Sequence, residues 1–379
     1  MLSAIILTSM LLISLFLTWN FLNDFAVDVF VGIDVAYDNV EEIKMLVDEV
    51  GSYINTIVIG STGITFNMTK LDHVCQYVYD KGLYFMIFAH PINDPEELLV
   101  QCQWVLNAKP RWGNQFLGLY AFDEPGGRQL DNASYKVVKD DKWFADNYAE
   151  AADKFVNETY LYLNHLIKDQ MCGLNLTLHT SDYALYWFDY KAQFDVVFAE
   201  FGWNYSRHLN VALCRGAANV QNKNWGVMIT WTYTQSPYLE SVNELYDDLV
   251  LAYENGADYI LIFDTNEDYT HGVLTPEHLD ALKRFWHYAG HNSRARNSHP
   301  DRVAYVLPQG YGYGFRGPDD TIWGLWEAND FSFEISTKVG ALINKYQNKI
   351  DIIYDDGLEI NNSYGYSTLL FWNGTILNP

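Results

Sequence analysis

Positively charged residues are scarce in this sequence of 379 residues. Lys and Arg number 24 against 48 Asp and Glu, so the formal net charge at pH 7 is −24. A chain this acidic is poorly suited to bind nucleic acid or anionic lipid head groups, because like charges repel each other. The composition therefore argues against a nucleic-acid partner and favours a neutral ligand.

Cysteine is also rare, with four residues at positions 75, 102, 172 and 214. None of them has the C-x-x-C spacing of a structural metal site, which argues against a zinc-stabilised fold. Two helices that follow one another in a barrel are neighbours, so we predict a Cys75–Cys102 disulfide between such helices. We also predict a Cys172–Cys214 disulfide.

Long hydrophobic runs are absent except at the N-terminus, where residues 2–22 are largely apolar and uncharged. We interpret residues 1–23 as a signal peptide or an N-terminal membrane anchor. Seven N-x-S/T sequons, at Asn67, Asn132, Asn157, Asn175, Asn204, Asn361 and Asn373, are consistent with a secreted glycoprotein. The expected location is extracellular or at the cell surface.

What the sequence does contain is a series of eight short apolar runs separated by helical patterns. They are 30–36 (FVGIDVA), 56–60 (TIVIG), 83–89 (LYFMIFA), 116–122 (FLGLYAF), 174–178 (LNLTL), 195–201 (DVVFAEF), 225–231 (WGVMITW) and 259–263 (YILIF). Eight alternations of strand and helix predict a (β/α)8 TIM barrel over residues 27–290. No Gly-rich phosphate loop is present, which argues against an open doubly wound sheet. Residues 128–141 are interpreted as an inserted loop over the barrel top.

The pattern changes after about residue 290. A polar linker is followed by apolar runs at 303–307, 350–354 and 368–372, with a helical pattern at 335–348. We predict that residues 291–379 form a small α/β C-terminal module of flavodoxin-like type.

Acids, histidines and aromatic residues gather where the predicted barrel strands end. Active sites of such barrels are built at the C-terminal ends of the strands. The residues assigned to substrate binding on this basis are Tyr37, His90, Asp123, His179, Trp203, Trp231, Tyr233 and Glu267. No cofactor and no metal ion is expected.

Four carboxylates at these strand ends are candidates for catalysis. Cleavage of a glycosidic bond commonly uses two carboxyl groups, one of them kept protonated as the general acid. Glu124, at the end of the fourth strand, is assigned as this acid. Glu200 is the first choice of partner, Asp264 the second and Asp34 the third. The pleat of a strand turns adjacent side chains to different sides, so Asp123 is expected to brace the structure.

Aromatic residues make up 16% of the chain, which suits a cleft that binds sugars on flat faces. Trp203, Trp231 and Tyr233 are the expected sugar platform. The predicted partner is therefore a carbohydrate.

The motif FDEP at 122–125 resembles the Asn-Glu-Pro ending of strand four in the large retaining clan of (β/α)8 glycoside hydrolases. The resemblance extends over about residues 30–290 and implies an O-glycosyl hydrolase with Glu124 as its acid. The sequence differs from that clan in having Asp123 in place of Asn. It also lacks an acid in the seventh run, ITWTYT, where the clan has its nucleophile. The C-terminal module resembles the amidotransferase-like domain that follows the barrel in some β-galactosidases.

Two other functions remain open at the level of sequence. A metal-dependent hydrolase could use His90, His179, Asp34 and Asp264, although the first run lacks the two histidines typical of amidohydrolases. A non-catalytic barrel that binds glycans at the cell surface would share every feature except a working acid pair.

Overall fold

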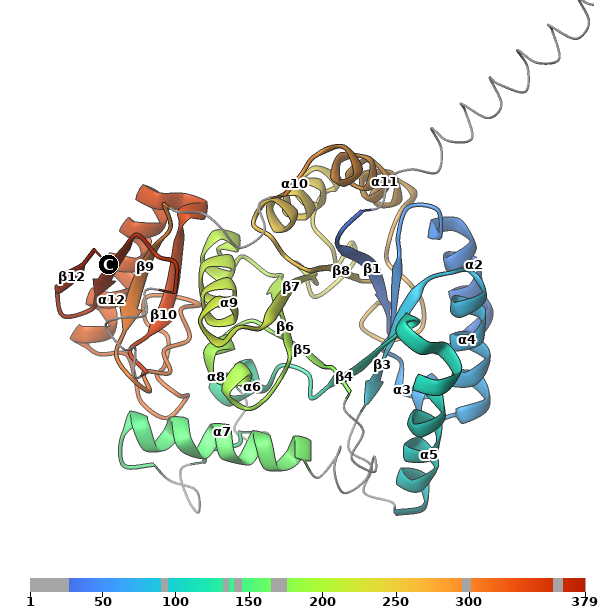
Figure 1. Ribbon diagram of the computed structural model, residues 1–379, viewed down its shortest axis with the longest axis horizontal. Helices are drawn as coiled ribbons and strands as arrows, with labels where there is room; N and C mark the ends of the chain where they lie inside the picture. Colours follow the sequence, from blue (N-terminus) through green and yellow to red (C-terminus); the bar gives the residue numbers. More distant parts are fainter. Residues whose placement is uncertain are drawn as a thin grey trace, which may run out of the picture.

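The computed structural model describes residues 27–89, 95–131, 136–139, 145–164, 176–294, 301–356 and 364–378, and its main feature is a closed barrel (Figure 1). The barrel strands run in the order β1-β2-β3-β4-β5-β6-β7-β8, and β1 pairs in parallel with β8. They are β1 (Phe30–Val35), β2 (Thr56–Ile59), β3 (Tyr84–Ala89), β4 (Phe116–Ala121), β5 (Leu178–Asp182), β6 (Val196–Phe201), β7 (Asn224–Ile229) and β8 (Tyr259–Phe263). The predicted TIM barrel is confirmed.

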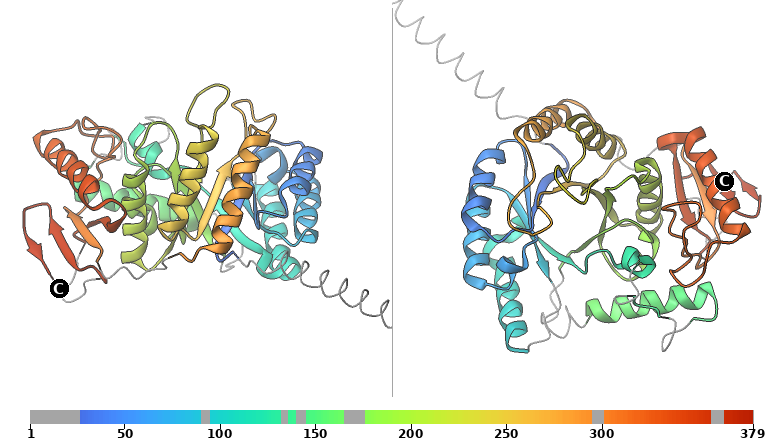
Figure 2. Two further views of the ribbon diagram at one scale, coloured as in Figure 1. Left: turned by 90° about the horizontal axis from the view of Figure 1, so that it is seen from above. Right: turned by 180° about the vertical axis from the view of Figure 1, so that it is seen from behind.

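Helices lie between the strands and surround the barrel, as the two views in Figure 2 show. They are α2 (Val40–Val50), α3 (Thr62–Thr65), α4 (Met68–Asp80), α5 (Pro95–Trp112), α6 (Pro125–Asp131), α7 (Tyr148–Asn164), α8 (Tyr186–Lys191), α9 (Arg207–Gln221), α10 (Val242–Glu254) and α11 (Pro276–His291). Local sequence signals explain several of their ends. For example, α10 begins with a capping box in which Ser241 and Glu244 bond to each other's backbone N–H.

Apolar side chains fill the inside of the barrel and form a floor below the C-terminal ends of its strands. This layer consists of Val58, Met86, Tyr120, Val196, Phe198, Met228, Tyr259 and Leu261. Strands with one face on this layer and the other against helices must be apolar on both sides, which is why the runs are nearly continuous.

Two boundaries differ from the prediction. The fifth strand covers Leu178–Asp182 instead of 174–178, because His179 and Ser181 face the barrel interior and were taken for a loop sequence. The expected inserted loop at 128–141 begins inside α6, a short helix that starts directly after Glu124.

A separate four-stranded sheet follows the barrel, as predicted for the C-terminal module. Its strand order is β10-β9-β11-β12, with β9 (Val303–Leu307), β10 (Ile350–Tyr354), β11 (Thr368–Phe371) and β12 (Ile376–Leu377). The first three strands are parallel, β12 is antiparallel, and α12 (Asp330–Tyr346) connects β9 to β10.

The module packs against α9 and α7 of the barrel domain (Figure 1). The buried guanidinium of Arg215 on α9 donates to the buried carboxylate of Asp351 at 2.7 Å. On the other side, the rings of Phe155 on α7 and Trp323 lie 5.5 Å apart. Charge pairing and aromatic packing thus join the two parts of the chain.

The predicted disulfides are not formed. Cys75 is a buried free thiol, so it makes no bridge to Cys102. Cys214 is also free and donates a hydrogen bond to the Val197 carbonyl, whereas Cys172 lies outside the described residues. Within the part of the chain that the structure describes, no helix is both long and apolar enough to cross a membrane.

Candidate active site

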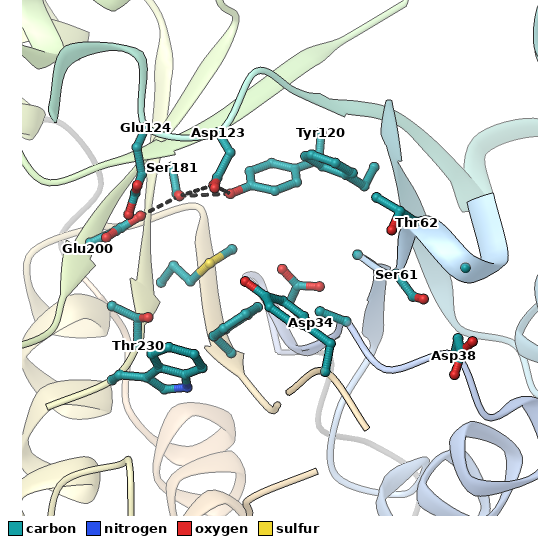
Figure 3. Close-up of a pocket in the computed structure, with 18 of the residues that line it drawn as sticks. Asp34, Asp38, Ser61, Thr62, Tyr120, Asp123, Glu124, Ser181, Glu200 and Thr230 are labelled. Atoms are coloured by element: carbon teal, nitrogen blue, oxygen red, sulfur yellow. Dashed lines mark hydrogen bonds between the residues drawn. The ribbon is translucent and has the colours of Figure 1, made fainter. Parts of the chain in front are cut away.

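A cavity of about 840 Å³ opens at the C-terminal ends of the barrel strands. Six carboxyl groups and one guanidinium line it, together with aromatic and hydroxyl side chains. The charged residues are Asp34, Asp38, Asp123, Glu124, Glu200, Asp268 and Arg128. Figure 3 shows Tyr120, Asp123, Ser181, Glu124 and Glu200 on one side of this cavity, with Asp34 facing them.

Both acids at the end of β4 line the cavity, which corrects the expectation that Asp123 would turn away. The backbone is in the left-handed region at Phe122 (φ 54°) and Glu124 (φ 53°). This departure from the pleat directs two consecutive carboxyl groups into one space. Because residues with a side chain rarely adopt φ > 0, the local conformation has an energetic cost that the surrounding contacts must offset.

Asp123 is held by three neighbours. The Tyr120 hydroxyl donates to its carboxylate at 2.5 Å, and the Ser181 hydroxyl lies 3.3 Å from the same oxygen. Its other oxygen forms an ion pair with Arg128 at 3.1 Å. Asp123 thus lies in a polar, charge-compensated environment.

Glu124 lies beside Asp123 in a different environment. Burial, the nearby charge of Asp123 and that of Asp182 raise its pKa from 4.5 to about 8. Arg128 is 3.9 Å away and opposes this shift only in part. Since 31% of the side chain remains exposed, the protonated carboxyl still reaches the cavity.

Glu124 and Glu200 lie close enough for each carboxyl group to shift the pKa of the other. Glu200 is only 5% exposed, and burial and the charge of Glu124 raise its pKa well above the ordinary value. The Ser181 hydroxyl donates to the other side of Glu200 at 2.6 Å. Two neighbouring carboxyl groups cannot both ionise cheaply, so each disfavours the charged form of the other.

Asp182, from the outer side of β5, fixes the chain just after Glu124. Its carboxylate accepts hydrogen bonds from the backbone N–H groups of Gly126 at 2.5 Å and Gly127 at 2.8 Å, at the start of α6. Burial raises its pKa to about 7 despite these bonds. The carboxyl of Asp189 on α8 is fully buried, and burial together with the charge of Asp182 raises its pKa well above the ordinary value.

Asp34, from β1, is 2% exposed, and its carboxyl faces the Glu124–Glu200 pair across the cavity (Figure 3). Burial and the charges of Asp123 and Asp264 raise its pKa well above the ordinary value. Among the described residues, its Oδ1 has no hydrogen-bond partner. A buried acceptor without a partner at a cavity wall can be satisfied by a ligand hydroxyl.

The structure brings half of the sequence-predicted site residues to this cavity. Those that line it are Asp34, Asp123, Glu124, Glu200, Trp203 and Trp231. Tyr233 lines an adjoining cavity instead, and His90 lies outside the described residues.

The other four predicted residues do not line the cavity. The carboxylate of Asp264, the second-choice partner, accepts the backbone N–H groups of Val273 and Leu274 and so braces the loop after β8. His179 is buried inside the barrel, where its ring stacks on Phe198. Burial lowers the pKa of His179 to about 4, so it is neutral at physiological pH.

Tyr37 and Glu267 are the remaining two. Tyr37 is 1% exposed and belongs to the hydrophobic core outside the barrel. Glu267 lies on the exposed loop after β8.

Tyr120 and Arg128 are functional candidates that the sequence analysis missed. Tyr120 was counted only as a strand residue, although it lies four residues before Glu124 and faces the barrel interior. Arg128 was taken for a loop residue. Its position four residues after Glu124, with Pro125 as a possible first helical residue, was the available signal for an acid–base pair on one helix face.

Metal binding at this site receives no support from geometry. In the described ranges, no group of three or more His, Cys, Asp or Glu side chains is arranged to hold a metal ion. Of the two histidines in the metal-hydrolase alternative, His179 is buried away from the cavity and His90 lies outside the described residues.

No protein-family model and no curated protein sequence matches the chain. Several solved structures have a similar fold. An active-site mutant of a Rhizomucor miehei beta-1,3-glucanosyltransferase in complex with laminaritriose is 14% identical, covers 65% of this chain and 91% of that chain, and has a TM-score of 0.38. A Penicillium canescens endo-1,4-beta-xylanase is 11% identical, with 70% and 97% coverage and a TM-score of 0.40.

A GH20 catalytic module of the pneumococcal exo-beta-D-N-acetylglucosaminidase is 10% identical, covers 69% of this chain and 83% of that chain, and has a TM-score of 0.37. The barrel is thus similar to those of glycoside hydrolases. At such identities and TM-scores the similarity says nothing about chemistry, for which the residues of the cavity are the evidence.

Proposed function

We propose that this chain is a glycoside hydrolase in which Glu124 is the general acid. The observation that carries the proposal is the pair of adjacent carboxyl groups, Asp123 and Glu124, in one cavity but in different environments. A pKa of about 8 keeps Glu124 protonated at neutral pH. A general acid works best when its pKa lies near the working pH, so this group is suited to protonate a leaving oxygen.

Asp123 supplies the negative charge. Its ion pair with Arg128 and its hydrogen bond from Tyr120 suit a carboxylate, in contrast to the buried carboxyl next to it. Glycoside hydrolysis passes through a transition state with positive charge on the sugar ring. A fixed carboxylate beside the acid stabilises that charge as it develops.

Glu200 acts as a positioning residue for Glu124 in this proposal. Catalytic carboxyl pairs that face each other across a glycosidic bond are separated by about 5–5.5 Å or by about 6.5–9.5 Å. Glu124 and Glu200 instead lie on the same side of the cavity (Figure 3). Glu200 therefore acts on the orientation and pKa of Glu124, whereas Asp34 lines the facing wall, where it can bind a sugar hydroxyl.

The reaction then follows from these positions. Glu124 gives its proton to the glycosidic oxygen while the bond between that oxygen and the sugar carbon breaks. Asp123 stabilises the cationic sugar, and a water molecule adds to its carbon. The proton released by that water returns to Glu124, so the enzyme is restored and one glycosidic bond is hydrolysed.

The test is hydrolysis of a panel of neutral oligosaccharides and aryl glycosides, measured as release of reducing ends or of the aryl alcohol. Glu124→Gln should lower turnover of oligosaccharides by about 10²–10⁴-fold. The loss should be smaller on aryl glycosides, because their leaving groups need less protonation. Glu49→Gln, which removes an exposed acid on α2, is the matched control and should retain wild-type activity. Equal losses on both substrates in Glu124→Gln would contradict the acid assignment.

A non-catalytic glycan-binding barrel is the second candidate, and one observation favours it. Glu124 and Glu200 lie on the same side of the cavity, so neither acid faces the other across it (Figure 3). If the purified protein binds oligosaccharides by calorimetry but releases no product from any of them, this function replaces the first.

We also propose that the chain is exported. The apolar N-terminus and the seven sequons support this, although residues 1–26 lie outside the described part. Expression in a eukaryotic cell with its native N-terminus should yield protein in the medium or on the cell surface. A mass decrease on enzymatic removal of N-glycans would be expected, and retention of unglycosylated protein in the cytosol would contradict export.

A further inference from the structure

A second cavity, of about 550 Å³, adjoins the catalytic cavity. Trp203, from the loop after β6, lines both of them. The rest of the second cavity comes from residues 232–237, in the loop after β7. The two spaces therefore meet at Trp203, and a ligand long enough to pass this side chain reaches both.

The lining of the second cavity differs in chemistry from that of the first. It contains no charged residue, whereas six carboxyl groups line the catalytic cavity. Its side chains are two aromatic rings, hydroxyl and amide groups and one proline: Trp203, Thr232, Tyr233, Thr234, Gln235, Ser236 and Pro237. None is a Leu, Ile, Val, Met or Phe, the side chains that would receive an apolar protein anchor.

Both aromatic rings are presented to the surface. Trp203 is 38% exposed and Tyr233 is 49% exposed. Tyr269, which lines the catalytic cavity from the loop after β8, is 54% exposed. Exposed aromatic side chains thus border both the catalytic cavity and the second cavity.

The two loops are held in place before any ligand binds. The backbone N–H of Trp203 donates to the Trp231 carbonyl at 2.8 Å, which ties the loop after β6 to that after β7. The N–H groups of Thr232 and Tyr233 donate to the Tyr238 carbonyl at 2.7 and 2.9 Å. A surface with this fixed backbone loses little conformational freedom on binding.

We propose that the second cavity is a subsite for further sugar units of a neutral oligosaccharide whose scissile bond lies at Glu124. This inference rests on the proposed function and names its substrate class: a chain that extends past Trp203, as opposed to an isolated terminal sugar. A sugar unit has a flat face of C–H groups and a rim of hydroxyls. The C–H face can stack on the rings of Trp203 and Tyr233, and the sugar hydroxyls can bond to the hydroxyl and amide groups of the 232–237 loop.

The experiment compares substrates of increasing length. For wild type, kcat/KM should rise from an aryl monoglycoside to a hexasaccharide of the same sugar. Tyr233→Ala should lower the ratio of these two values by about tenfold, the upper range for loss of one aromatic face contact. Tyr160→Ala removes another exposed tyrosine, on α7 and 37% exposed, and should leave the ratio at the wild-type value. An unchanged ratio in Tyr233→Ala, or equal kcat/KM for short and long wild-type substrates, would overturn the subsite.

A binding measurement separates failure of the subsite from failure of the proposed function. Titration of the protein with the hexasaccharides of cellulose, xylan, laminarin and chitin, followed by tryptophan fluorescence, needs no turnover. If Tyr233→Ala binds one of these hexasaccharides more weakly than wild type does, and wild type hydrolyses none of them, the subsite is supported and the proposed enzymatic function is contradicted. If wild type hydrolyses the substrates but kcat/KM does not depend on their length, the enzymatic function is supported and the subsite is contradicted.

Discussion

The carboxyl groups of Glu124 and Glu200 shift each other's pKa although β4 and β6 are not adjacent in the barrel. Strand β5 lies between them and contributes Ser181, whose hydroxyl donates to Glu200 at 2.6 Å. Side chains from three strands therefore meet at this point, and the titration of either glutamate is a property of the pair. The predictions below follow from this interaction and from the carboxylates that support it.

Activity should fall as the pH rises above about 8. The general acid must carry a proton, and burial together with Asp123 raises the pKa of Glu124 to about 8. The measurement is kcat/KM on an oligosaccharide between pH 5 and 10. A profile that stays flat through pH 9, or that falls already near the ordinary glutamate pKa, would rule out Glu124 as the proton donor.

Stability should also fall as the pH rises between 4.5 and about 8. In this range folded Glu124 keeps a proton that the unfolded chain releases, since its pKa is raised from 4.5 to about 8 in the fold. Unfolding then releases a proton and is favoured by higher pH, whereas below 4.5 both states are protonated and the contribution is constant. The measurement is the free energy of unfolding in denaturant across this range.

Glu124→Gln should reduce the slope of stability against pH. Glu240→Gln is the matched comparison, because burial and Asp248 raise the pKa of Glu240 to about 8 at a site beside Arg207 that does not line the catalytic cavity. It should reduce the same slope without moving the pH profile of activity. An unaltered slope in both variants would show that neither carboxyl retains its proton in the folded state.

Ser181→Ala should lower turnover and move the pH dependence of the acid pair upward. The Ser181 hydroxyl bonds to Glu200 and lowers its pKa, so removing it raises the pKa of Glu200. The loss of this hydrogen bond should cost about 1 kcal/mol of stability. Thr180→Ser is the control, because it keeps the neighbouring hydroxyl that donates to Phe122. A variant with wild-type kcat and pH profile would mean that Ser181 does not act on the pair.

Asp182→Asn and Asp264→Asn form a matched pair. Each replaces a buried carboxylate that accepts backbone N–H groups. Asp182 accepts those of Gly126, Gly127, Tyr183 and Ala184, and Asp264 accepts those of Val273 and Leu274. Each should destabilise the fold by about 1–3 kcal/mol, measured by denaturant unfolding.

Only Asp182→Asn should also lower kcat strongly, because Asp182 fixes the start of α6, which directly follows Glu124. Glu124→Gln combined with Asp182→Asn should then lose little further activity. If Asp264→Asn instead abolished turnover in a protein of normal stability, Asp264 would be a catalytic group and its bracing role secondary.

Much of the barrel followed from local sequence. The run 259–263 is the observed β8 without change, and the other runs are within a residue or two at most ends, except the fifth. A strand buried on both faces must be apolar throughout its length, so its position is visible without knowledge of its neighbours. The fifth strand was misplaced because its inward residues His179 and Ser181 are polar, and only the barrel provides the partners that make their burial acceptable.

The sequence by itself determined that acids would collect at one end of the barrel, because the ends of parallel strands coincide in space. Only the tertiary structure decided which of these acids lie close to each other. Left-handed backbone at Phe122 and Glu124 turns two consecutive carboxyls into the cavity, and β5 brings Ser181 between Asp123 and Glu200. Asp264, which also directly follows a predicted barrel strand, accepts hydrogen bonds from loop N–H groups instead. Strand ends are set by local burial, whereas contacts between carboxyls depend on backbone angles and strand neighbours that no short stretch of sequence specifies.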